Sequence, residues 1–207
     1  MSKSHKRSLI YTNPFLYRLM MFALYGREYF DRFAKIGFFV CDSSSVVELC
    51  CGFGDFYTYG LKNKQVDYSG VDLSPDFVDY GLKKGIKITE GDVNSFNFPR
   101  SDYYIMISSL YHFHPNPEII IKKMLAAAVK SVIIVEPVKN LLNSRHKIIS
   151  RLALLLTNEG EGKNNFRFTD GSLSQLMEAH FKKNIVKIAE TKNGKEKIYI
   201  LKPEIKT

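Results

Sequence analysis

The chain has 207 residues, of which 45% are hydrophobic and 25% charged, proportions typical of a soluble globular protein with one domain, or one domain and an extension. Its three cysteines, two of them adjacent, give neither a disulfide framework nor a CxxC metal site, so a reducing, cytoplasmic location is expected. No run of about 18 apolar residues is present, and no transmembrane helix is therefore predicted.

Residues 1–43 are predicted to form a helical extension that acts as a lid. Asn13 can cap a helix that begins at Pro14, and residues 14–39 read as a helical region with an apolar face, made of Leu16, Leu19, Met20, Phe22 and Ala23. This face favours packing on the sheet or over the active site. A second interpretation is an interfacial membrane helix, which would suit a lipid-like substrate. Arg18 interrupts the apolar stretch and no small-residue cleavage site follows, so a signal peptide is not expected.

A strand, a tight glycine turn and the start of a helix are predicted over residues 46–55. A β-branched pair leads into Glu48, and Gly52 and Gly54 follow with one residue between them. Glycine is used where a ligand lies against bare backbone or where φ is positive. A helix that begins here points its free N–H groups and its positive dipole end at whatever lies over the loop. The turn suits a nucleotide-like ligand, although glycine pairs also occur in plain loops.

Two further predicted strands end near acidic residues, at the edge of the sheet where ligands bind in open α/β folds. Residues 66–72 end in Asp72, which lies 18 residues after Gly54, near the offset expected for an acid that binds ribose hydroxyls. Ser74 is predicted to cap the helix that follows. Residues 86–89 lead to Asp92, which can accept a hydrogen bond from an exocyclic amine such as that of adenine.

These motifs resemble the cofactor-binding motifs of class I S-adenosylmethionine-dependent methyltransferases. The resemblance covers roughly residues 44–137 well and residues 165–203 in outline. It implies S-adenosylmethionine as cofactor and S-adenosylhomocysteine as product. The loop, with Glu48 as its acid and Gly52 and Gly54 as its second and third glycines, would hold the methionine end. Asp72 would bind ribose and Asp92 would contact adenine, with Leu73, Val93 and Ser108 also expected at the cofactor.

Cys50 stands where the first glycine of this family's loop is usual. Because cysteine is small, the departure is mild unless position 50 requires a positive φ. The main competing interpretation is a nicotinamide-binding loop, whose fingerprint needs a third glycine three residues after the second. That position is Tyr57, whose bulk disfavours close packing of helix on strand, so hydride transfer is the less favoured reaction.

The remaining elements continue an α/β alternation. Strands are predicted at 102–109 and 131–137, helices at 117–130, 141–156 and 172–181, a flexible loop at 157–167, and a hairpin made of 184–191 and 195–202. The predicted fold is a doubly wound, mostly parallel, seven-stranded sheet with a C-terminal antiparallel hairpin. Residues 44–207 would form this Rossmann-like domain, with 138–167 as an insertion that covers the substrate.

Candidate catalytic residues follow the fourth strand and end the fifth. A histidine side chain can take up a proton near neutral pH, so His112 could be a general base or position the acceptor, or it could be structural. Tyr111 could line the pocket or belong to the core. Glu136 could face the acceptor or pair with a basic neighbour. His112 and His114 lack a third ligand at suitable spacing, so no metal site is predicted.

The net charge of +9 resides entirely in residues 119–207, which hold 17 Lys/Arg and 8 Asp/Glu. The lysines are scattered and no Arg/aromatic cluster is present, so a solvated surface is favoured over a nucleic-acid platform. The predicted function is methyl transfer by direct displacement to a small apolar or amphipathic acceptor, with O-methylation slightly favoured. Alternatives are an RNA- or protein-directed methyltransferase and a non-catalytic cofactor-binding protein.

Overall fold

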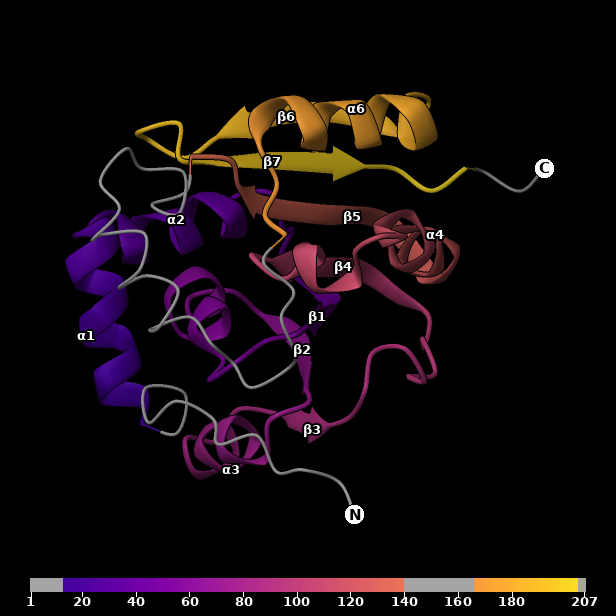
Figure 1. The fold of residues 1–207 in the computed structure, drawn as a ribbon. Helices are drawn as coiled ribbons and strands as arrows, with labels where there is room; N and C mark the ends of the chain where they lie inside the picture. The colour runs from indigo at the N-terminus through magenta and orange to yellow at the C-terminus, as the bar shows by residue number, and fades with distance from the viewer. Residues whose placement is uncertain (1–12, 140–165, 205–207) are drawn as a thin grey trace, which may run out of the picture.

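A computed structural model describes residues 13–139 and 166–204 and shows one sheet covered by helices on both faces (Figure 1). The sheet has seven strands in the order β3-β2-β1-β4-β5-β7-β6. The strands are β1 Ser44–Leu49, β2 Val66–Asp72, β3 Ile88–Glu90, β4 Ser101–Ile107, β5 Ala128–Pro137, β6 Ile185–Glu190 and β7 Glu196–Leu201. The predicted seven-stranded fold with a C-terminal hairpin is confirmed.

Strand directions define where a ligand can bind. Strands β3, β2, β1, β4 and β5 are parallel, whereas β7 pairs antiparallel with both β5 and β6. The strand order reverses between β1 and β4, and open α/β sheets bind ligands outside the carboxyl ends of the strands at such a switch point. Because β7 is antiparallel, its first residue, Glu196, lies beside Pro137 at the same edge of the sheet.

Three helices begin at the predicted positions, Pro14, Pro75 and Pro117, whereas the last begins at Asp170, two residues before the predicted start. Ser74 lies at the predicted N-cap position, but its side chain forms no capping hydrogen bond. The helices are α1 Pro14–Tyr25, α2 Glu28–Gly37, α3 Pro75–Lys83, α4 Pro117–Ala127 and α6 Asp170–Phe181, with the short helical turns η2 Tyr57–Leu61 and η3 Leu110–Phe113. The Asn13 side chain accepts the N–H groups of Phe15 and Leu16 at 3.0 and 3.2 Å, as a helix N-cap does. The region predicted as helical over 14–39 is therefore two helices separated at Gly26, which has a φ of +63°.

Two details differ from the predictions, and a third prediction is untested. Helix α4 ends at Ala127 and β5 begins at Ala128, three residues earlier than expected, because Ser101 of β4 pairs with Ala128. The helix after the glycine turn is reduced to a short π-helical segment, η2. The predicted helix at 141–156 lies outside the described residues. Only residues 166 and 167 of the predicted loop are described, and only 138, 139, 166 and 167 of the predicted lid insertion.

Each face of the sheet has its own core cluster, because side chains alternate along each strand. On one face, Tyr104 and Met106 of β4 pack with α4 and α6. On the other, Tyr103 and Ile105 pack with α2, η2 and α3. The residues of both clusters are buried from solvent, and the central strands have almost no exposed residues. The two cores fix the positions of the strand ends that form the site.

Helix α2 is built into this second core. Its residues Tyr29, Phe33 and Ile36 are buried, and its backbone closely approaches η2. A Cβ atom added to Gly37 would lie 2.1 Å from the carbonyl oxygen of Gly60, so only glycine fits at this crossing. Within the described residues, no helix is long and apolar enough to cross a membrane.

Candidate cofactor and acceptor site

The loop after β1 turns on three residues with positive φ. Gly52 and Gly54 have φ values of +55° and +76°, and Cys50 has a φ of +55°. The backbone at position 50 is therefore in the left-handed region, where a residue other than glycine is strained. A side chain in this region carries a strain of about 1–2 kcal/mol. The cysteine is thus a strained substitution rather than a mild one.

The two glycines have different roles. A Cβ atom at Gly54 would lie 2.8 Å from Cδ1 of Ile86, so this glycine lets the loop pack on the core. A Cβ atom at Gly52 would meet only the Phe77 ring, at 3.9 Å. The backbone of Gly52 is therefore next to open space, as a backbone that a ligand must approach would be.

Asp72 connects the ends of β1 and β2. Its carboxylate accepts the N–H of Gly52 at 2.7 Å and the N–H of Ser74 at 2.9 Å, and the residue is 8% exposed. These bonds fix the carboxylate against the glycine loop.

Glu48 lies beneath the loop rather than on its open side. It is buried, and the Tyr68 hydroxyl donates to its carboxyl group at 2.5 Å. Burial raises its pKa to about 8, even though the bond from Tyr68 acts in the opposite direction. Burial also raises the pKa of the neighbouring Cys51 thiol, so this cysteine remains protonated and is not an activated nucleophile.

The other predicted cofactor residues lie along the same edge. Leu73 is exposed next to Asp72, and Val93 is buried in the core. Asp92 is exposed on the loop after β3, where one of its oxygens accepts the backbone and side-chain N–H groups of Asn94 at 2.8 and 3.0 Å. The structure thus brings Asp72, Leu73 and Asp92 to neighbouring strand ends.

Asp55 attaches the N-terminal helices to the glycine loop, a role that the sequence analysis missed. It forms an ion pair with Arg18 of α1 at 2.5 Å and accepts the Tyr29 hydroxyl of α2 at 2.6 Å. Tyr17 packs edge-on against Phe53 within the loop, with ring centroids 5.5 Å apart. Helix α1 therefore lies against the outside of the loop, the place expected of a lid.

A buried polar network closes the edge beyond β4. Arg32 of α2 and Glu196 of β7 form an ion pair at 2.5 Å and are 6% and 1% exposed. Ser108, in a left-handed conformation with a φ of +54°, donates to Glu196 at 3.3 Å and accepts from Arg32 at 3.4 Å. The sequence analysis missed Arg32 and Glu196, because neither belongs to a motif and they are 164 residues apart.

Glu136 supports the segment that carries the candidate catalytic residues. Its carboxylate accepts the N–H of Leu110 at 2.6 Å, and it is 1% exposed. Burial raises its pKa to about 8, although backbone hydrogen bonds lower it. The residue therefore holds the turn after β4, and its carboxyl group is not presented on the surface.

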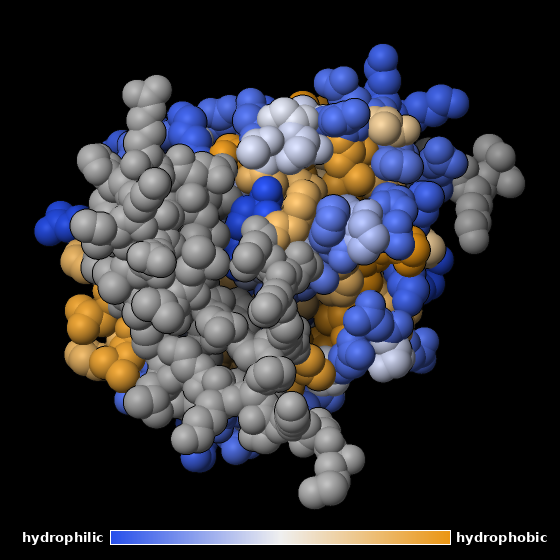
Figure 2. Space-filling model, viewed as in Figure 1, coloured by the Kyte–Doolittle hydropathy of each residue, from blue (hydrophilic) through white to orange (hydrophobic). Residues whose placement is uncertain are grey.

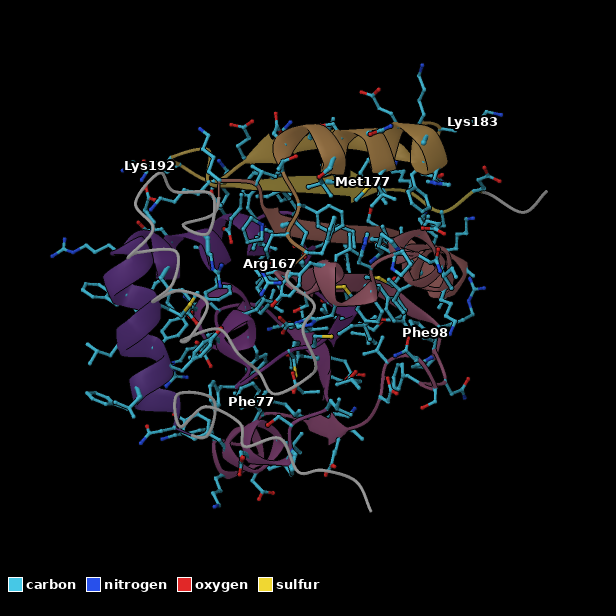
Figure 3. The ribbon with its side chains drawn as sticks, viewed as in Figure 1. Phe77, Phe98, Arg167, Met177, Lys183 and Lys192 are labelled. Atoms are coloured by element: carbon cyan, nitrogen blue, oxygen red, sulfur yellow. The ribbon has the colours of Figure 1, made fainter. Side chains whose placement is uncertain are left out.

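Tyr111 and His112 share a small aromatic group with Arg167. The rings of Tyr111 and His112 have centroids 4.0 Å apart. The guanidinium of Arg167 lies 3.8 Å from the Tyr111 ring centroid, a cation–π contact. Figure 3 shows Arg167 next to the short helix after β4. Tyr111 is almost buried, whereas His112 is half-buried.

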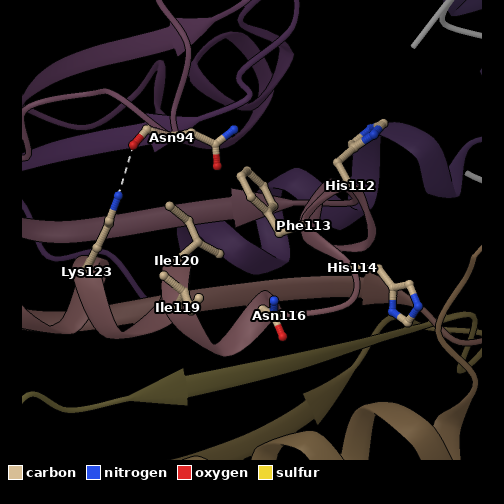
Figure 4. A pocket seen from close by; sticks show the side chains of 8 residues that line it. All are labelled: Asn94, His112, Phe113, His114, Asn116, Ile119, Ile120 and Lys123. Atoms are coloured by element: carbon tan, nitrogen blue, oxygen red, sulfur yellow. Dashed lines mark hydrogen bonds between the residues drawn. The ribbon is translucent and has the colours of Figure 1, made fainter. Parts of the chain in front are cut away.

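His112 also lines a cleft of about 290 Å³ between the loop after β3 and helix α4 (Figure 4). The cleft is lined by Asn94, His112, Phe113, His114, Asn116, Ile119, Ile120 and Lys123. The Lys123 ammonium closes one end by donating to the Asn94 carbonyl at 3.0 Å. His112 thus lines a cleft that combines apolar side chains, such as Phe113 and Ile120, with polar ones.

A sequence model of one protein family matches residues 30–159. The family is described as "Methionine biosynthesis protein MetW", and the matched stretch contains the glycine loop, Asp72, Asp92 and the segment after β4. The chain belongs to the MetW family. No curated protein matches the sequence of this MetW-family chain at a significant level.

Solved structures that resemble this chain include several methyltransferases. The magnesium protoporphyrin IX methyltransferase of Synechocystis PCC 6803 with bound SAH has a TM-score of 0.62 and 12% identity, covering 86% of this chain and 85% of its own. A possible histamine N-methyltransferase from Thermotoga maritima has a TM-score of 0.64 and 16% identity, over 95% and 99%. The plantazolicin methyltransferase BamL with SAH has a TM-score of 0.65 and 12% identity, over 94% and 93%. The MetW-family chain has the class I methyltransferase fold.

In this fold, the site is equipped for binding and orientation. One end of the edge offers a fixed carboxylate, Asp72, and an open backbone at Gly52. The other offers His112, Tyr111 and the network around Ser108. In the described part of the chain, no group of three or more His, Cys, Asp or Glu side chains is arranged to hold a metal ion. Two histidines of the segment after β4, His112 and His114, line the cleft with their side chains.

Proposed function

We propose that this MetW-family chain is an S-adenosylmethionine-dependent methyltransferase that acts on a small apolar or amphipathic acceptor. The observation that carries the proposal is the position of Asp72. Its carboxylate is held by the Gly52 and Ser74 N–H groups at 2.7 and 2.9 Å, beside backbone that is open to a ligand. These contacts support the proposal because they hold an acid suited to ribose hydroxyls beside a bare glycine loop.

The residues present fit this cofactor. Asp72 would accept the two ribose hydroxyls, Leu73 would pack on the adenine, and Asp92 would accept from its amine. Gly52 and the strained Cys50 would form the wall near the methionine end, with Glu48 beneath them. When bound, the cofactor supplies a methyl group on a sulfonium, which leaves by direct displacement. The protein's task is to orient the acceptor and to exclude water.

The acceptor side is proposed to be the segment after β4. Glu136 holds the Leu110 backbone, and so fixes where Tyr111 and His112 lie. His112 would then orient an acceptor hydroxyl or amine at the mouth of the cleft, or take its proton. Helix α1, anchored through Asp55, would act as the lid. The acceptors named for structures of the same fold support a small organic acceptor.

Calorimetric titration of S-adenosylhomocysteine into the purified protein tests the cofactor. We expect micromolar affinity, and we expect Asp72→Ala to weaken it about 10- to 100-fold, because hydrogen bonds to a charged group are lost. Asp79→Ala, on the exposed side of α3, is the matched control and should bind normally. Absence of binding in the wild-type protein, or equal affinity in the two variants, would refute the proposal.

The acceptor is tested by measuring methyl transfer to a panel of small hydroxyl and amine compounds of increasing apolar length. His112→Gln keeps a polar side chain but cannot titrate. If His112 is a general base, kcat of the variant should fall about 100- to 10,000-fold and the acidic limb of its pH profile should disappear. If His112 only positions the acceptor, KM should rise and the pH profile should stay unchanged. Transfer to RNA alone, with binding that weakens steeply with salt, would instead favour the RNA-directed alternative.

A further inference from the structure

The outer face of α1 exposes large apolar side chains. Phe15, Leu19 and Phe22 are 72%, 54% and 45% exposed. Their spacing of four and three residues places them in one line along the helix; we call them the α1 stripe. Figure 2 shows the corresponding hydrophobic surface at the left edge of the molecule, where α1 lies in Figure 1.

An ordinary surface helix buries its apolar residues and exposes polar ones. Helix α1 has apolar residues on both sides: Tyr17 and Met21 pack on the core beneath it, and the stripe faces outward. Its inward side also carries Arg18, which pairs with Asp55 and donates to the Tyr80 hydroxyl at 3.0 Å. The stripe also continues beyond α1, because the Phe22 ring lies 6.4 Å from that of Phe30 in α2. A continuous exposed apolar surface of this kind marks an interaction site.

The charge around the stripe indicates the kind of partner. Residues 1–27 contain five Lys/Arg and no Asp/Glu. Three of the five, Lys3, Lys6 and Arg7, stand ahead of α1 in the sequence, and Arg27, which follows it, is exposed. Glu28 and Asp31 come next, so residues 1–31 keep a net charge of +3 (5 − 2). Aromatic and leucine side chains on one face, together with an excess of cations, are the features of a helix that lies in the surface of an anionic bilayer.

We propose that the α1 stripe binds the surface of an anionic phospholipid bilayer, with α1 parallel to the membrane. Its apolar side chains enter the boundary between headgroups and acyl chains, and the flanking cations attract the anionic headgroups. Because Arg18 and Tyr17 fasten α1 to the glycine loop through Asp55 and Phe53, the bound protein holds the glycine loop directly behind the membrane-bound helix. The further step, that the methyl acceptor is an amphipathic molecule taken from the membrane, rests on the proposed function.

Co-sedimentation with vesicles tests the binding. The full chain is mixed with vesicles of phosphatidylcholine containing phosphatidylglycerol, and separately with vesicles of phosphatidylcholine alone. We expect binding to the anionic vesicles that weakens as salt is added. The triple variant Phe15→Gln, Leu19→Gln and Phe22→Gln, whose new side chains favour helix, should lower the partition coefficient at least about tenfold.

The matched control replaces exposed apolar residues on other helices. Leu82→Gln on α3 and Ile119→Gln on α4 remove side chains that are 53% and 52% exposed, and should leave vesicle binding unchanged. Circular dichroism and S-adenosylhomocysteine binding test whether the triple variant is folded. We expect that it is, because its inward contacts are untouched.

Three results would overturn the inference: no binding of the wild-type chain to anionic vesicles, equal loss in the triple and control variants, or a stripe-dependent dimer. Light scattering detects the last as a doubled mass that the triple variant loses. The calorimetric test of the cofactor contains no lipid, so failure of vesicle binding with normal S-adenosylhomocysteine binding refutes only this inference. Vesicle binding without cofactor binding refutes only the proposed function.

Discussion

Replacing Glu48 by glutamine should change how the stability of the protein depends on pH. Glu48 is 3% exposed, and burial raises its pKa from 4.5 to about 8. Between these values the folded protein keeps the proton, whereas the unfolded chain releases it. Stability from this group is therefore fully present below the unfolded pKa and is lost as pH rises toward the folded pKa.

The slope follows from proton linkage. One proton held only by the folded state lowers the free energy of unfolding by up to about 1.4 kcal/mol per pH unit. Glutamine has the shape of the protonated acid, and its carbonyl oxygen can accept the Tyr68 hydroxyl, but it does not titrate. Relative to wild type, Glu48→Gln should therefore gain about 2–3 kcal/mol between about pH 5.5 and 7.5. Glu136 titrates in a similar range in both proteins, so its contribution cancels in the difference.

Urea unfolding at a series of pH values measures this difference. The chain has no tryptophan, so circular dichroism is the suitable signal. Glu90→Gln, an exposed acid at the end of β3, is the control and should leave the slope unchanged. Parallel stability curves for wild type and Glu48→Gln would show that the Glu48 carboxyl is not held protonated by burial.

Three further substitutions test the geometry of the loop and its supports. Cys50→Gly should relieve the left-handed strain and raise stability by about 0.5–1 kcal/mol after the greater entropy of unfolded glycine is counted; a loss of stability in urea unfolding would contradict the strained turn. Gly37→Ala should lower stability by about 1–3 kcal/mol, because its Cβ would overlap the Gly60 carbonyl, and unchanged thermal unfolding would argue against that close crossing. Tyr29→Phe removes the hydroxyl that donates to Asp55 and should cost about 1–3 kcal/mol; wild-type stability would indicate that water replaces this bond.

Features encoded by short stretches of sequence were predictable. The Asn13 cap, the strand that ends in Asp72 and the hairpin at the chain end all depend on neighbouring residues or simple alternation, and the structure contains each of them. The contact between Asp72 and Gly52 could also be predicted in part, because the carboxyl ends of neighbouring parallel strands meet at one edge of the sheet.

Contacts between distant segments were not predictable in this way. Asp55 looked like an ordinary acid at the start of a helix, and nothing in its surroundings indicated that Arg18 and Tyr29 would converge on it. The positive φ of Cys50 results from the path of the whole loop, not from the preference of cysteine. Glu136 was expected near the acceptor or a cation, but its buried position leads it to bind a backbone N–H instead.

The ion pair between Arg32 and Glu196 also constrains how the protein is made. During synthesis Arg32 leaves the ribosome 164 residues before its partner, so α2 exists for most of translation without the carboxylate that neutralises its guanidinium. Breaking a buried pair of this kind costs about 3–5 kcal/mol. The same unpaired charge on Arg32 opposes the packing of α2 on the core until β7 has been synthesised. Helix α2 and strand β7 therefore lock together in one late step, and a nascent chain released before Glu196 would have an incomplete edge at the site.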